Sequence, residues 1–216
     1  MAADRLCFHC GAPSDPALDN CGYCGVKRIA MGPSAGMAPS GWEVRLPRGE
    51  LEWGPPFTIA LPASDNELVV LRSHALLDDV AVDIGFRFDA GQIWAPGLTS
   101  SALGVSLRAS SNAGYDVSVS IAGLVSISRY EGGKLGGWLL EPCVHDKVHE
   151  GLGAINALSI TMEGDRLSVR INGVDAASVR DRARRSGAVE LHVRPGAVPA
   201  RVVIGSLAVR ELTADV

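Results

Sequence analysis

Polar and apolar residues alternate with a period of two in several stretches of this chain. The pattern is clearest at residues 79–86, 115–121, 167–171 and 189–193. Successive side chains of a β-strand point to opposite faces, so each stretch predicts a strand with one face in a core and the other in water. No stretch holds a helical period. The pattern therefore predicts a mainly β chain built from antiparallel strands.

Turn residues separate these stretches at short intervals. Gly-containing pairs occur at residues 122–123, 132–133 and 172–173. The last pair, Asn172-Gly173, is the strongest hairpin signal because both residues tolerate positive φ. Short strands joined by tight turns predict a sandwich or a barrel.

Two cysteine pairs mark the start of the chain. Cys7 and Cys10 form one Cys-x-x-Cys pair, and Cys21 and Cys24 form the other. Four thiolates in two such pairs satisfy a closed tetrahedral zinc site, so we expect one structural Zn²⁺. A rubredoxin-like iron site and two disulfides are the alternatives, and His9 could replace one cysteine as a ligand.

Composition divides the chain into three parts. Residues 1–28 resemble a short zinc-ribbon module, residues 29–41 are small and uncharged and predict a linker, and residues 42–216 carry the alternating pattern. The formal net charge of −4 gives no general attraction to nucleic acid or anionic lipid. Short apolar runs predict no membrane span, and no apolar signal segment stands at the N-terminus, so we expect a cytoplasmic protein.

The longer part resembles a known superfamily. The stretches that carry the likeness are a Tyr-led strand at 115–121, a Gly-x-Trp-x-Leu turn at 136–140, an Asn-x-Leu-x-Ile strand at 156–160 and the hairpin at 164–174. They resemble the concanavalin A-like lectin/glucanase superfamily, in its laminin-G and 3-keto-disaccharide-hydrolase-like branch, where the third pattern ends in Val. The resemblance implies an antiparallel jelly-roll β-sandwich with one concave sheet.

The predicted strand at 79–86 is the first candidate for catalytic residues. Glucanases of this superfamily carry alternating acidic residues on one strand, and the nearest counterpart here is Asp79 and Asp83 with Ala81 between them. We interpret both aspartates as a solvated strand face, and on this ground we expect no enzyme. Cys143, His145 and His149 could form a second site, but we interpret them as a buried cysteine with surface imidazoles.

Five other residues are candidates for ligand binding. Trp94 and Trp138 could stack against sugar rings, and the basic segment at 180–185 offers Arg182, Arg184 and Arg185 to an acidic partner. We therefore expect a non-catalytic binding protein whose partner is a protein or a glycan, with membership of a larger assembly left open. The alternatives are a carbohydrate-active hydrolase and a nucleic-acid adaptor that uses the ribbon and the arginine loop.

The cysteine pairs generate the first test. We expect one zinc ion per chain to co-purify, and Cys10→Ser to lose the metal while the large sandwich stays folded, because structural zinc drives the folding only of the module that it binds. Metal analysis of freshly reduced protein checks this. Iron, or no metal at all, would contradict it.

Overall fold

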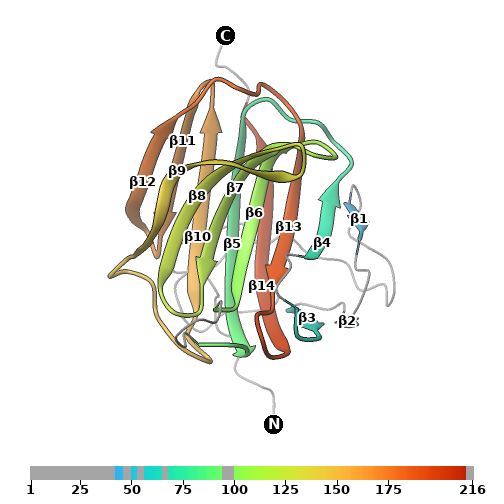
Figure 1. Ribbon diagram of the computed structural model, residues 1–216, viewed down its shortest axis with the longest axis vertical. Helices are drawn as coiled ribbons and strands as arrows, with labels where there is room; N and C mark the ends of the chain where they lie inside the picture. Colours follow the sequence, from blue (N-terminus) through green and yellow to red (C-terminus); the bar gives the residue numbers. More distant parts are fainter. Residues whose placement is uncertain (1–41, 46–49, 53–55, 65–67, 94–99, 213–216) are drawn as a thin grey trace, which may run out of the picture.

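Two seven-stranded antiparallel sheets form the described part of the chain (Figure 1). The computed structural model describes residues 42–45, 50–52, 56–64, 68–93 and 100–212. The predicted zinc ribbon and linker lie outside these residues. No helix occurs in the described ranges, and hence none long and apolar enough to cross a membrane.

Sheet A has the strand order β1-β4-β13-β6-β7-β8-β9, and sheet B has the order β12-β11-β10-β5-β14-β3-β2. The strands of sheet A are β1 (Trp42–Val44), β4 (Leu68–Ser73), β6 (Ala102–Ala109), β7 (Gly114–Ser120), β8 (Leu124–Glu131), β9 (Lys134–Val144) and β13 (Ala188–Arg194). Those of sheet B are β2 (Glu50–Glu52), β3 (Phe57–Leu61), β5 (Val80–Ala90), β10 (Asn156–Glu163), β11 (Arg166–Ile171), β12 (Val174–Arg180) and β14 (Ala200–Glu211). The predicted mainly β, antiparallel sandwich is confirmed.

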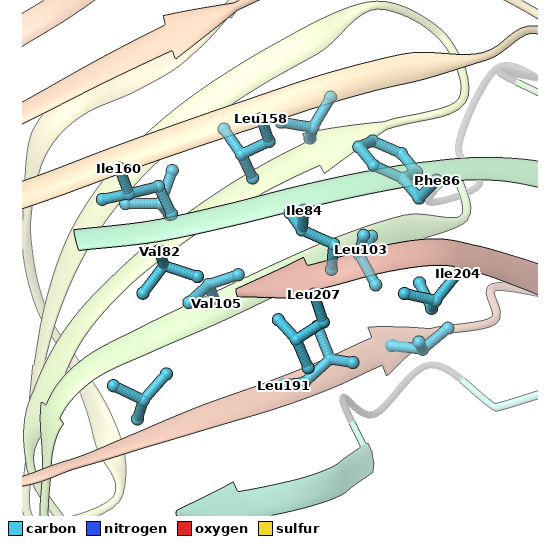
Figure 2. Packing of buried hydrophobic residues seen from close by; sticks show 14 of the residues in the cluster. Val82, Ile84, Phe86, Leu103, Val105, Leu158, Ile160, Leu191, Ile204 and Leu207 are labelled. Carbon is cyan, nitrogen blue, oxygen red and sulfur yellow. The ribbon is translucent and has the colours of Figure 1, made fainter. Parts of the chain in front are cut away.

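The core lies between the two sheets. On β5 the apolar residues Val82, Ile84 and Phe86 are buried, and their counterparts from sheet A include Leu103 and Val105 (Figure 2). Full burial of one such side chain stabilises the fold by about 1.5–3 kcal/mol, so the period-two pattern supplies most of the driving force. The alternation predicted for residues 79–86 is therefore the pattern that builds the core.

The two strands at the middle of sheet A depart from the simple pattern. Every residue of β6 is buried, and so is every residue of β13 up to Val193. Alternation places half of these residues on the face that points away from the core, where the sequence predicts contact with water. That outer face of sheet A is therefore shielded, although its residues are polar.

The predicted hairpin at Asn172-Gly173 joins β11 to β12. Both residues have positive φ, 50° and 82°, and the flanking Ile171 and Val174 are paired, as in a two-residue type I′ turn. The Asn172 side chain also accepts a hydrogen bond from the Ala157 amide (2.7 Å) and so ties the turn to β10. The hairpin prediction is confirmed.

This turn generates a stability test. Gly173→Val places a β-branched residue at positive φ, and we expect a loss of about 1–3 kcal/mol in the free energy of unfolding. Gly137→Val is the matched control, because Gly137 lies in β9 with open space around its Cα and no positive φ. Urea unfolding of both variants checks the difference. Equal stabilities would contradict the turn assignment.

Candidate functional site

One row of residues crosses the whole of sheet A. Residues directly opposite each other in neighbouring strands share a face of the sheet. The pairing registers place seven residues in this row, in the order Glu43, Arg72, Glu190, Ser106, Asp116, Ser128 and Trp138. We call it the polar row. At about 4.8 Å per strand, it extends about 24 Å from Arg72 on β4 to Trp138 on β9.

The polar row lies on the face that points away from the core. Its members alternate along their strands with Leu71, Leu191, Val105, Val117 and Ile127, all of which belong to the core. The charged members at its centre are nevertheless shielded, since only 8% of the Glu190 side chain and 13% of the Asp116 side chain are exposed. Buried carboxylates need partners, because removing an unpaired charge from water is costly.

Each of these two carboxylates has a partner. Glu190 forms a close ion pair with the Arg72 guanidinium, which also donates a long hydrogen bond (3.4 Å) to the Ala109 carbonyl. Asp116 lies in hydrogen-bond contact with Nε2 of His192 and accepts a hydrogen bond of 3.4 Å from the Ser106 hydroxyl. The two pairs stand next to each other at the centre of the sheet.

A glycine makes the second pair possible. His192 is on β13 and Asp116 is on β7, so the imidazole must reach across β6, which lies between them. The residue of β6 opposite His192 is Gly104, and a Cβ at that position would overlap the imidazole ring. The absence of a side chain at Gly104 therefore allows the ring to lie over the strand.

Tyr130 completes the cluster from β8 in a similar way. Its partner in β7 is Gly114, and a Cβ there would lie 2.6 Å from the Tyr130 hydroxyl. Burial, followed by the negative charge of Glu190, raises the pKa of Tyr130 to about 12. The phenol therefore keeps its proton at physiological pH and can donate it in a hydrogen bond.

Trp138 lies at the end of the polar row. It belongs to β9, which is the edge strand of sheet A, and its side chain is 45% exposed. Leu135 of the same strand is opposite Tyr130 and is 54% exposed. Of the residues predicted to bind a ligand, Trp138 thus shares a face with the charged cluster, whereas Trp94 lies outside the described residues.

The arginine segment lies elsewhere, after the edge strand β12 of sheet B. Arg182 is exposed and forms an ion pair with Asp165 (2.8 Å). The main chain of Arg184 donates to the Tyr115 hydroxyl (3.2 Å) and accepts from the Arg108 guanidinium (2.7 Å). Arg185 is exposed. The structure therefore does not bring these arginines to the polar row.

Asp79 and Asp83 have separate partners. Asp79 is not simply solvated, because its Oδ1 accepts hydrogen bonds from the buried Arg108 guanidinium (3.1 Å) and from the Gly164 amide (2.8 Å). Asp83 forms an ion pair with Arg210 (2.7 Å) on the outer face of sheet B. The interpretation of a solvated strand face is thus corrected for Asp79.

The remaining sequence candidates form no cluster. Cys143 is exposed, His145 accepts a hydrogen bond from the Lys147 amide (3.3 Å), and Nδ1 of His149 lies 2.9 Å from the Ile155 carbonyl. Within the described residues no group of three His, Cys, Asp or Glu side chains is placed to hold a metal. The four N-terminal cysteines lie outside them, so the zinc site stays a prediction.

Sequence reasoning missed the central residues of the site. The missed residues are Arg72, Asp116, Tyr130, Glu190 and His192. One signal was present, since Asp116, Glu190 and His192 occupy the polar positions of two predicted strands. The pattern gives the face on which each residue lies, but only the strand order brings β7 and β13 to either side of β6.

Solved structures share this sandwich. CBM66, a carbohydrate-binding module from Bacillus subtilis, has a TM-score of 0.56 at 16% identity over 79% of this chain and 96% of that chain. The Bacillus licheniformis β-glucanase has a TM-score of 0.58 at 8% identity over 82% and 95%. The alginate lyase AlgAT5, of polysaccharide lyase family 7, has a TM-score of 0.56 at 9% identity over 81% and 95%.

The common architecture is a concanavalin A-like β-sandwich. Identities this low show the fold alone. Neither a protein-family model nor a curated protein matches the sequence.

The comparison corrects the prediction that the chain is not an enzyme. That prediction rests on the lack of paired glutamates on the strand of Asp79 and Asp83. A glucanase and a lyase share the sandwich, so the fold is one that supports catalysis. The shielded side chains of Asp116, Glu190 and His192 lie on sheet A, away from the strand on which the prediction depends.

A second stability test concerns Asp181, which anchors the arginine segment. Burial raises the pKa of its carboxyl, but the hydrogen bond from the Tyr115 hydroxyl (2.7 Å), assisted by Arg129 (2.9 Å), outweighs burial, and the pKa is lowered. A carboxyl whose pKa is lower in the folded state stabilises the fold above its unfolded pKa of about 3.9, and this contribution is lost as the pH falls through the folded value.

We therefore expect Asp181→Asn to lose about 1–2 kcal/mol in the free energy of unfolding at neutral pH, and the gap to the wild type to narrow as the pH falls to about 3. Asp83→Asn is the control, because an exposed ion pair contributes at most about 1 kcal/mol. Urea unfolding at both pH values measures the gap. A gap that stays constant with pH would contradict the charge-based account.

Proposed function

We propose that this protein is a carbohydrate-active enzyme that hydrolyses a glycosidic bond on the outer face of sheet A. One observation carries the proposal: two shielded carboxylates, an imidazole and a protonated phenol lie together on one face of the sheet. Acid–base catalysis requires such groups, and burying them has no benefit for folding alone. This proposal replaces the non-catalytic adaptor function that was expected from the sequence.

The spacing of the two carboxylates supports hydrolysis. Glu190 and Asp116 stand two strands apart in the polar row, with Ser106 between them. Their main chains are thus about 10 Å apart, at about 4.8 Å per strand. Inverting glycosidases hold their carboxyl groups about 6.5–9.5 Å apart, which leaves room for the attacking water. Carboxyl groups on main chains about 10 Å apart can reach this separation, which is compatible with an inverting reaction.

The partners of the two carboxylates suggest their roles. Glu190 forms a close ion pair with Arg72 and is the candidate for the general base that activates water. The Asp116 carboxylate and the His192 imidazole are in hydrogen-bond contact, and this pair is the candidate for the acid that protonates the leaving oxygen. The Tyr130 phenol keeps its proton, because its pKa is raised to about 12, and lies in the same cluster. Trp138 offers an exposed ring on which a sugar can stack.

The N-terminal part enters the proposal as an appended module. We propose that Cys7, Cys10, Cys21 and Cys24 bind one structural zinc ion, and that the protein works in the cytoplasm. The sequence patterns alone support both statements. The chemistry proposed for sheet A depends neither on the zinc ion nor on the location of the protein in the cell.

The test is an activity screen with charge-removing variants. The full chain is incubated with a panel of soluble glucans, xylans, mannans, fructans and uronate polymers, and new reducing ends are measured. We expect cleavage of at least one polymer, and a loss of kcat/KM of about 10²–10⁴-fold in Asp116→Asn and in Glu190→Gln.

Asp83→Asn is the matched control, because it removes a carboxylate from the opposite sheet and should leave kcat/KM unchanged. Release of an unsaturated uronate would show elimination and overturn the assignment to hydrolysis. Binding of a glycan without cleavage at any pH would overturn the assignment to an enzyme.

A further inference from the structure

We infer that the glycan recognised on sheet A is uncharged, which rests on the proposed carbohydrate-related function of this face. The inference depends on how the charges of the polar row are compensated. An acidic sugar needs a cation that is free to meet its carboxylate. A neutral sugar needs hydrogen-bonding groups and apolar area, with no excess charge.

Arg72 is the only lysine or arginine in the polar row, and its charge is already compensated. Its guanidinium forms a close ion pair with Glu190, and the remaining contact is to the Ala109 carbonyl. Both side chains are largely shielded, at 17% and 8% exposure, so salt in the solvent screens the pair only weakly.

The arginines nearest the polar row are engaged as well. Arg45, beside the β1 end of the row, pairs with Glu43 (2.9 Å), and Arg194, further along β13, also has an interaction partner. A carboxylated sugar placed over the centre of the row would face Glu190 and the Asp116–His192 pair. Like charges brought close in a shielded site repel each other strongly.

The rest of the face suits hydroxyl groups. Small polar side chains lie on the outer face of the three middle strands β6, β7 and β8, namely Ser106, Ser118, Ser126 and Ser128. In the register, Ser118 is opposite both Gly104 and Ser126, and Ser128 is opposite Trp138. Such short side chains leave room for a flat ring and offer it donors and acceptors without charge.

The experiment compares one glycan in two charge states. The probe is the gluco- or manno-oligosaccharide that binds the full chain best by calorimetry, together with the same oligosaccharide after oxidation of its C6 hydroxyls to carboxylates. For the wild type we expect the oxidised form to bind at least tenfold more weakly.

A variant that removes one partner of the ion pair should weaken this preference. Glu190→Gln keeps the shape of the side chain and leaves the Arg72 charge uncompensated, so the oxidised form should bind the variant at least tenfold more tightly than it binds the wild type. The double variant Arg72→Gln with Glu190→Gln is the control, and it should lose the gain.

The outcomes separate the two proposals. If the oxidised form binds the wild type as well as the neutral form, or if no neutral oligosaccharide binds, the inference is wrong. It is also wrong if a folded Glu190→Gln variant gains nothing. Because binding is measured without turnover, a neutral glycan that binds with the expected preference but is not cleaved supports the inference while it removes the enzymatic assignment.

Discussion

The pleat of an antiparallel sheet is the constraint on which this molecule depends. Because successive residues of a strand point to opposite faces, each core residue between the sheets fixes its neighbours on the outer face. The burial of Leu191 and Val105 thus orients Glu190, His192 and Ser106 away from the core. Packing energy that holds the sandwich together also sets the geometry of the polar row, and a slip of one residue in any strand would destroy both.

Much of the fold could be predicted from the sequence, for the same reason. Period two at residues 79–86 and 189–193 identifies strands without any knowledge of their partners, and Asn172-Gly173 identifies a hairpin because its backbone requirement is local. The candidate site could not be found this way. Asp116 and His192 are 76 residues apart and meet only because β7 and β13 flank β6. Strand order is a property of the whole sheet, and no local pattern encodes it.

Catalytic residues could not be predicted from the sequence for a related reason. The sequence places two acidic residues, Asp79 and Asp83, on one strand, but each of these has a structural partner of its own. The groups proposed for catalysis come from four different strands, β4, β13, β7 and β8, with one or two residues from each. Two glycines are also part of the site, although the pattern of polar and apolar residues does not reveal them. Gly104 and Gly114 have no side chain, and this allows His192 and Tyr130 to lie across the strands.

The two ends of the polar row differ in how firmly the sheet holds them. The charged centre belongs to strands paired on both sides, whereas Trp138 belongs to β9, which pairs within the sheet only with β8 and has most of its residues exposed (Figure 1). Strands bonded on one side open locally at a lower free energy than central strands, so their amides exchange sooner with solvent. The molecule thus combines a rigid centre with an aromatic rim that can adjust its position.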